Sequence, residues 1–350
     1  MQKFKILIVN LKKEIYISWL RLKLKPQSQT FSIKEKLFAH LETWRPYTFV
    51  WCGLVSLVGA CLAYNGTPSF RVMILSFFIP LIGWIASLYA SDFLDRNLDA
   101  IGKKHRPIPS GRISSKEALI TGSFFAFTGF FLSFFLTIYN VLFAIIVAIL
   151  VISYTKIFKS KGIFGNINRG FITIAAFFYG IFSVNQSFSE IPMYLFLLAF
   201  VFLLHDTNSN MIGAIRDVKG DKKGGYETFP VKHGIKKSMI LSFILTVSWF
   251  FLIIFIPWYY QFLSLHFYLI MIVDVGILII FYYYLMKTFE HHTRKTALRY
   301  HEFFIIERIT LASALLFGVI DVAVAASIFI FSMIVTLLSQ YILRGRYEGV

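Results

Sequence analysis

Long runs of apolar residues, separated by short polar stretches, repeat along the chain from residue 47 to residue 342. None alternates polar and apolar positions as a half-buried strand does, and most are close to the roughly 20 residues that a helix needs to cross a bilayer. The pattern predicts an all-α, polytopic bundle of about nine transmembrane helices, or ten if the last run is two helices. The expected spans are 47–65, 70–93, 117–138, 140–157, 164–184, 192–214, 237–257, 264–286 and 303–342.

The composition agrees with this pattern. Of the 350 residues, 57% are hydrophobic and only 15% are charged, which is typical of polytopic membrane proteins. No Gly/Pro-rich linker divides the spans. We therefore expect a basic N-terminal segment (1–44), one transmembrane domain (45–343) and a short tail (344–350). Cys52 and Cys61 lie in one span, nine helical residues apart, too far for a disulfide.

The distribution of the charged residues, whose net charge is +17, indicates how the chain is oriented in the membrane. Lys and Arg gather before the first span and after the even-numbered ones, whereas the alternate connections hold almost none. This is the positive-inside pattern, and it predicts that the N-terminus and the ends of even-numbered spans are cytoplasmic. Arg344 and Arg346 fit only if there are ten spans. The expected partner is a lipid bilayer and not nucleic acid.

Two acidic clusters stand at the ends of even-numbered spans. Asp92, Asp95 and Asp99 fall at i, i+3 and i+7, which is one face of a helix. Asp217 and Asp221 form the second cluster, with Asp206 and Asn210 upstream. Ionised carboxylates near hydrocarbon are costly without a strong partner. Because both clusters lie on the same side of the membrane, we expect them to share bound metal ions.

Carboxylate oxygens without His or Cys favour a hard cation such as Mg²⁺, which in proteins usually bridges to the phosphates of a substrate. Basic residues follow each cluster, Lys103 and Arg106 after the first and Lys222 after the second. Such cations neutralise phosphate oxygens that a metal leaves uncovered. The sequence therefore predicts a Mg²⁺-dependent site for a phosphorylated ligand, with an active site that faces the cytoplasm.

The order of these motifs resembles that of the UbiA-type superfamily of intramembrane prenyltransferases. Residues 91–99 read Ser-Asp-x-x-Asp-x-x-x-Asp, similar to the family's Asn-Asp-x-x-Asp-x-x-x-Asp. Residues 106–111 read Arg-Pro-Ile-Pro-Ser-Gly, and 217–221 match the second motif, Asp-x-x-x-Asp. The likeness spans roughly residues 40–240. Two departures are Ser91 in place of Asn, and Ala214 where many relatives carry an acid.

The resemblance implies that an isoprenoid chain moves from a prenyl diphosphate donor to an aromatic or other hydrophobic acceptor, such as a lipid. It implies roles for the residues at matching positions. The expected metal ligands and catalytic acids are Asp92, Asp95, Asp99, Asp217 and Asp221. Tyr154 is expected to orient the diphosphate or to stabilise an allylic cation. The expected substrate contacts are Lys103, Arg106 and Lys222 on the diphosphate, Arg45 on the acceptor, and Asn210 one turn before Ala214.

Two other classes stay open at this point. Acids within membrane spans are also typical of a divalent-cation or phosphometabolite transporter, although transport sites usually lie near the bilayer midplane. A family member that has lost turnover and acts as a scaffold is the third reading, and the intact acids of both motifs disfavour it. The sequence does not specify the acceptor, the prenyl chain length, the oligomeric state or the roles of Asp206, Asp274 and Asp321.

Overall fold

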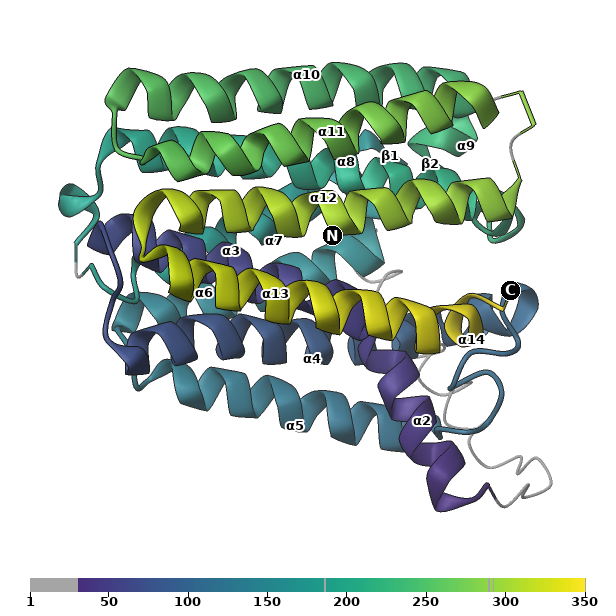
Figure 1. Cartoon of the computed structure of the whole chain (residues 1–350). Coiled ribbons are helices and arrows are strands. Elements are labelled where there is room, and N and C mark those ends of the chain that lie inside the picture. The colour runs from purple at the N-terminus through teal and green to yellow at the C-terminus, as the bar shows by residue number, and fades with distance from the viewer. Residues whose placement is uncertain (1–30, 186, 289, 292, 350) are drawn as a thin grey trace, which may run out of the picture.

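The computed structural model describes residues 31–185, 187–288, 290–291 and 293–349 as a bundle of long helices that run side by side (Figure 1). Residues 1–30 of the expected N-terminal segment lie outside this range. The long helices are α3 (Pro46–Tyr64), α4 (Phe70–Gly102), α5 (Ser115–Ser133), α6 (Ile138–Ser153), α7 (Ile163–Ile181), α8 (Met193–Lys223), α10 (Ile235–Tyr260), α11 (Leu265–Thr288), α12 (Arg294–Val319) and α13 (Val322–Ser339).

Short elements complete the fold, and most of them lie at one end of the bundle. There α2 (Ile33–Trp44) packs against α4 and α14, and the strands β1 and β2 pair in parallel, Lys161 opposite Glu227. The short elements besides α2 are η1 (Tyr154–Phe158), β1 (Lys161–Gly162), η2 (Phe188–Glu190), β2 (Glu227–Thr228), α9 (Phe229–His233), η3 (Gln340–Arg344) and α14 (Gly345–Glu348).

The last apolar run, 303–342, is two helices rather than one. Asp321 ends the connection between α12 and α13, and its Oδ1 accepts from the backbone N–H groups of Ala323 (2.9 Å) and Val324 (3.1 Å). This is an N-cap, which satisfies donors that a helix start leaves unpaired. The described residues thus form ten long helices. The division of the last run into two helices is the alternative that the sequence left open.

Seven of the described helices are long and apolar enough to cross a membrane by length and composition alone: α3, α4, α6 with η1, α8, α10, α11, and α13 with its extension. The helices α5, α7 and α12 run among them in the same bundle (Figure 1). Large apolar side chains face outward along the bundle, for example Phe127 (74% exposed) and Ile272 (68% exposed). So much exposed apolar surface needs lipid as its surroundings. The chain is a multi-pass integral membrane protein.

The core is centred on α3, most of whose residues are buried. It packs against α4, α7, α12 and α13. Glycines allow the closest of these contacts, because a Cβ on Gly59 or Gly180 would collide with backbone atoms of the facing helix. Small residues let helix backbones approach in this way in membrane proteins. Cys52 and Cys61, also on α3, are buried and free, as expected.

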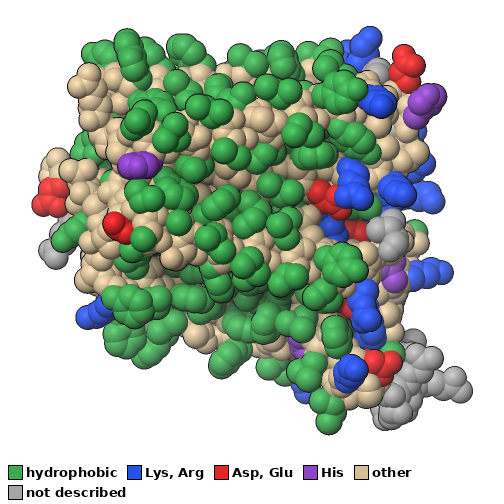
Figure 2. Space-filling view, in the orientation of Figure 1, with side chains coloured by type: hydrophobic (Ala, Val, Ile, Leu, Met, Phe, Trp, Pro, Cys, Tyr) green, Lys and Arg blue, Asp and Glu red, His purple; other side chains and the backbone are tan. Residues whose placement is uncertain are grey.

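Charged side chains gather at one end of the bundle, the end at which α2, α9 and α14 lie (Figures 1 and 2). Both acidic clusters are there. Helix α4 runs on past the expected end at residue 93 to Gly102, and α8 runs through Gly213 to Lys223. Each cluster is therefore carried on a rigid helix that projects from the apolar part of the bundle. The expectation that the two clusters lie on the same side is confirmed.

Candidate active site

A polar cavity of about 230 Å³ lies at the charged end, between α4 and α8. Residues from the first acidic cluster and from the second line the same cavity. Other residues line it as well, among them Arg45, Lys103, Arg106, Tyr154, Lys159, Arg169, Arg216 and Glu348. The tertiary structure thus brings together most of the residues singled out in the sequence.

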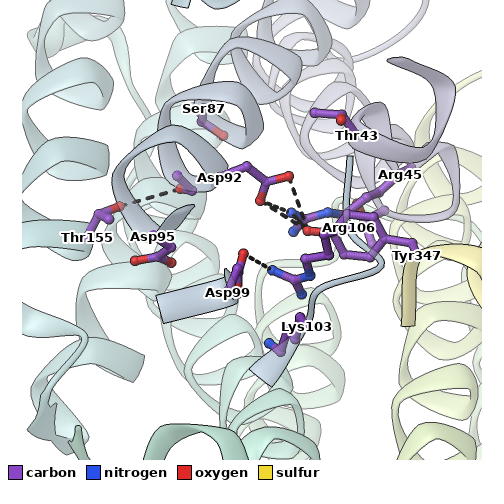
Figure 3. A network of polar contacts seen from close by, with 12 residues as sticks. Thr43, Arg45, Ser87, Asp92, Asp95, Asp99, Lys103, Arg106, Thr155 and Tyr347 are labelled. Carbon is purple, nitrogen blue, oxygen red and sulfur yellow. Dashed lines mark hydrogen bonds and ion pairs between the residues drawn. The ribbon is translucent and has the colours of Figure 1, made fainter. Parts of the chain in front are cut away.

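Each carboxylate of the first cluster is held by a cation, and Figure 3 shows the pairs of Asp92 and Asp99. Asp92 pairs with Arg45 and accepts from the Tyr347 hydroxyl, with oxygen–oxygen distances of 3.0 and 3.2 Å. Asp95 pairs with Lys159. Asp99 accepts from Arg106 Nη1 at 2.8 Å. These buried or half-buried pairs fix the three side chains in place without any other ligand.

In the second cluster, the two carboxylates differ in their cation partners. Asp217 accepts a forked pair of bonds from Arg216, at 2.8 and 3.3 Å, and Lys103 Nζ lies 3.6 Å from Asp217 Oδ1. Asp221 accepts from Thr228 Oγ1 at 3.4 Å. No ion pair of Asp221 is found among the residues that the structure describes. Each of the other four acids has a Lys or Arg partner, so the Asp221 carboxylate is the one most available to an added cation.

The pKa values of Lys103 and Lys159, two lysines of the cavity, are shifted in opposite directions. Burial lowers the pKa of Lys103, and the Asp217 carboxylate opposes that shift only in part. Burial acts in the same direction on Lys159, but there the Asp95 carboxylate outweighs it and raises the pKa above its ordinary value. Tyr226 donates to Asp95 at 3.4 Å. Lys159 is therefore a permanent cation beside the first cluster.

The remaining predicted residues divide into those that reach the cavity and one that does not. Tyr154 and Asn210 line it, and Asn210 Oδ1 accepts from Asn166 Nδ2 at 3.0 Å. Arg45, Lys103 and Arg106 line it as well. Lys222 does not: it is exposed near the end of α8. A helix presents successive residues about 100° apart, so Lys222 points away from the face that carries Asp217 and Asp221.

Several residues of the cavity were not predicted. Arg169 lies in α7, 3.8 Å from Asp206 and with its guanidinium 4.3 Å from the centre of the Trp84 ring. A charged residue inside an otherwise apolar span is itself a signal, and it could have found Arg169. Lys159 stands in the basic stretch after the fourth span. For Tyr347 and Glu348, which come from the far end of the chain, the sequence holds no such signal.

Two further polar residues, His205 and Asp274, are buried inside the bundle. His205 Nε2 lies 2.9 and 3.0 Å from the two carboxylate oxygens of Glu307, inside the bundle. Asp274 is fully buried, and neither of its carboxylate oxygens has a hydrogen-bond partner in the described part of the chain. Neither His205 nor Asp274 lines the polar cavity.

A second, apolar cavity of about 520 Å³ adjoins the polar one. The two share the lining residues Trp84, Ser87, Val151 and Ile172. The apolar cavity runs between α4, α5, α6 and α7, and exposed side chains such as Phe127 form part of its wall, so it communicates with the lipid-facing surface. Together the two cavities suit a ligand with an anionic head and a long hydrocarbon chain.

The donor chemistry of the site fits Mg²⁺. Five carboxylates from two helices face one polar cavity, and carboxylate oxygens are the ligands that this ion prefers. In the conformation described, four of the five are bound by Lys or Arg. In the described ranges, no three acidic, His or Cys side chains are close enough to enclose a metal ion. Binding of a metal–phosphate complex thus requires that these carboxylates and cations exchange partners.

Comparison with known proteins gives a consistent set of relatives. A family model described as the UbiA prenyltransferase family matches residues 52–307. Digeranylgeranylglyceryl phosphate synthase of Pyrococcus horikoshii is 31% identical over 204 residues, which are 58% of this chain and 72% of the relative. The synthase of the same name from Methanosarcina mazei is 26% identical over 252 residues, 68% of this chain and 86% of the relative.

Solved structures agree with this result. A structure of digeranylgeranylglyceryl phosphate synthase is 25% identical, with a TM-score of 0.60, and the match covers 81% of this chain and 99% of that one. A UbiA homolog from Archaeoglobus fulgidus, bound to DMAPP and Mg²⁺, is 16% identical, with a TM-score of 0.54 and coverage of 87% and 99%. The second likeness is one of fold alone.

Proposed function

The chain belongs to the UbiA prenyltransferase family, and we propose that it transfers an isoprenoid chain from a prenyl diphosphate to a lipid acceptor with a glyceryl phosphate head. The resemblance in the sequence motifs is thereby confirmed, and so is the all-α membrane fold. The chain is an intramembrane prenyltransferase, which displaces the transporter and scaffold readings.

One observation carries the proposal: the cation- and carboxylate-rich cavity adjoins the apolar cavity and shares part of its lining. Trp84, Ser87, Val151 and Ile172 stand at the boundary between them. A prenyl diphosphate has the same two-part character. Its diphosphate matches the polar cavity and its chain matches the apolar one, so the bond between them lies at the boundary.

The side chains of the polar cavity account for binding of the diphosphate. We assign Lys103, Arg106 and Lys159 to its oxygens, because all three are buried or half-buried cations beside the acidic clusters. Asp92, Asp95, Asp99, Asp217 and Asp221 would hold Mg²⁺, which when bound stabilises negative charge on the departing diphosphate. Arg106 and Lys159, which pair with Asp99 and Asp95, would also contact diphosphate oxygens in that arrangement.

The apolar cavity accounts for protection of the reacting carbon. Loss of the diphosphate leaves an allylic cation, which water would capture if it had access. Trp84, held by its Nε1 hydrogen bond to Thr48 Oγ1 (3.3 Å), forms part of the boundary, and Tyr154 from η1 lines the polar cavity. Aromatic faces attract cations. We assign Tyr154 and Trp84 to stabilising this charge while the acceptor attacks.

We infer the acceptor from the product that appears in the name of the relatives, digeranylgeranylglyceryl phosphate synthase. A digeranylgeranylglyceryl phosphate carries two geranylgeranyl groups on glyceryl phosphate. One transfer that yields it uses geranylgeranyl diphosphate and glyceryl phosphate that already carries one such group. We extend this donor and acceptor to the present chain. We also place the active site on the cytoplasmic side, because the basic connections lie at its end of the bundle.

The proposal is tested with purified protein in lipid nanodiscs, given geranylgeranyl diphosphate, geranylgeranylglyceryl phosphate and Mg²⁺. We expect release of diphosphate together with formation of the doubly prenylated lipid. Asp95→Asn and Asp217→Asn should each lower turnover by at least about 100-fold, as loss of a key electrostatic group commonly does. Donor consumption with no transfer to this acceptor would contradict the lipid assignment, and full activity of both variants would contradict the site.

A further inference from the structure

The segment that follows α13 folds back into the active site. It comprises η3 and α14 and lies beyond residues 52–307, which the family model matches. Arg344, in η3, is buried and donates to the Leu298 carbonyl at 3.1 Å. This bond ties the segment to α12. The next residues, Tyr347 and Glu348, are 1% and 2% exposed, so both are enclosed by the site.

Tyr347 is inserted between two cations of the cavity. Its ring centre lies 4.1 Å from the guanidinium carbon of Arg45 and 4.3 Å from that of Arg106, and its hydroxyl donates to Asp92 (Figure 3). The Tyr347 carbonyl accepts from His105 Nε2 at 2.9 Å. These contacts fix the position of the residue that follows.

Glu348 is held between arginines from two different helices. Its Oε1 lies 3.1 Å from Arg216 Nη1 on α8, in an ion pair, and its Oε2 accepts from Arg294 Nη2 on α12 at 3.3 Å. Arg216 is oriented by its forked bonds to Asp217. A buried carboxylate between two fixed guanidinium groups marks a site built for an anion.

We infer that Arg216 and Arg294 form a second anion subsite, which takes the phosphate of the acceptor lipid and which Glu348 fills until that lipid binds. The inference rests on the proposed function. Arg216 and Glu348 line the same cavity as the five acids. Yet the cations of the subsite are not those paired with the first cluster, which are Arg45, Lys159 and Arg106. Donor diphosphate and acceptor phosphate thus have separate cations.

We expect the phosphate of the acceptor lipid to bind Arg216 and Arg294 more strongly than the Glu348 carboxylate does. A phosphate monoester carries a charge of about −1.5 to −2 and three acceptor oxygens, whereas a carboxylate carries a single charge on two. Arginine forks bind both groups, so the guanidiniums need not move far. Glu348 thereby gives the buried Arg216, which Asp217 also holds, a second carboxylate partner, and it pairs with the partly exposed Arg294.

The first test is kinetic and uses Glu348→Gln, which keeps shape and removes charge. We expect the KM for geranylgeranylglyceryl phosphate to fall roughly threefold to tenfold, since loss of a charged hydrogen bond from the competing group is of that order. The KM for the donor should not change. A rise in the acceptor KM would show that Glu348 supports the lipid instead of competing with it, and would overturn the inference.

The second test removes one arginine in the background without the competing carboxylate. Glu348→Gln/Arg294→Gln, compared with Glu348→Gln alone, should raise the KM for the phosphorylated acceptor about tenfold or more. The KM for the matching alcohol, geranylgeranylglycerol, should stay the same. Arg299→Gln is the matched control, because Arg299 is an exposed arginine of the same helix paired with Glu302. An equal effect on both acceptors would count against a phosphate subsite.

The third test needs no turnover. Hydrogen–deuterium exchange in Gly345–Gly349 of the wild-type protein should rise when geranylgeranylglyceryl phosphate is added, and not when the alcohol is added. Inorganic phosphate alone distinguishes a site for any phosphate from one that requires the lipid. Equal exchange in every arm would overturn the inference.

The two proposals fail in distinguishable ways. If no prenyl transfer occurs but the phosphorylated lipid raises exchange, the subsite stands and the reaction assigned to it is wrong. Prenyl transfer could instead occur while the Glu348 and Arg294 substitutions leave the acceptor KM unchanged and the lipid leaves hydrogen exchange unchanged. In that case the proposed reaction stands and the proposed subsite is wrong.

Discussion

Four of the five acids of the site are each paired with their own cation. Asp92, Asp95, Asp99 and Asp217 each have an Arg or Lys partner, and only Asp221 among the five lacks one in the described residues. Buried ionised groups are stable only when they are paired. The pairs with the first cluster also place Arg106 and Lys159 beside the position that we assign to the diphosphate.

Two lysines test the placement of the diphosphate. Lys159 lines the cavity, whereas Lys222, which the sequence favoured, is exposed. Lys159→Met should lower kcat/KM for the prenyl diphosphate by about 100-fold, in line with the loss of a buried charge contact. Lys222→Met should change it by no more than about twofold, as exposed ion contacts contribute little. Steady-state rates in nanodiscs measure both, and a larger effect of Lys222→Met would restore the sequence-based assignment.

At the scale of elements, the acids of the active site lie near the ends of helices rather than at their centres. Helices α4 and α8 continue beyond the apolar stretch that predicts them and carry the acids out to the cavity. Helix α6 passes into a wider π-helical turn at Tyr154. Such turns shift the helix phase and are frequent at functional sites. Here the turn accompanies a tyrosine that lines the site.

The contact between α3 and α7 depends on glycine. A Cβ on Gly180 would collide with the Ser56 carbonyl, whereas one on Gly276 in α11 would meet nothing within 4 Å. Gly180→Ala should therefore destabilise the protein by about 1–3 kcal/mol, the usual cost of overpacking, with a lower melting temperature in detergent. Gly276→Ala is the matched control and should melt close to wild type. Equal melting of the two variants would contradict the close approach of α3 and α7.

At the scale of the whole molecule, both acidic clusters and the segment after α13 meet at one end of the bundle (Figure 1). This arrangement has a topological consequence. Reporter tags placed in the connections 103–114 and 224–234 should both be protected from an external probe and both map to the cytoplasm. Mapping to opposite sides would be incompatible with one shared site. A tag in the connection 65–69 serves as the external control.

Metal and fold are separable in this molecule. Since Lys and Arg pair with four of the five acids, chelation should abolish prenyl transfer but leave the melting temperature nearly unchanged. Added Mg²⁺ should restore the activity. Thermal melting and diphosphate release, measured on the same chelated sample, check both parts. Unfolding on chelation would show that the metal is structural, and full activity would exclude it from the reaction.

The sequence by itself determined the membrane bundle, both acidic motifs and the family, because these depend on short-range patterns: apolar runs of bilayer length and acids at helical spacing. It left the division of 303–342 open, since two apolar helices joined by Ile320 and Asp321 look like one long run. Where Lys222 points was also not settled, because the phase of a helix end depends on what it packs against.

The tertiary structure alone decided which cations face the acids and what closes the site. Tyr347 meets Asp92 across 255 positions of the chain, and Glu348 lies between arginines of α8 and α12. Contacts of such long range leave no periodic or local trace in a sequence. They arise only when the helices pack and their ends converge, because burial then requires each charge brought together there to find a partner.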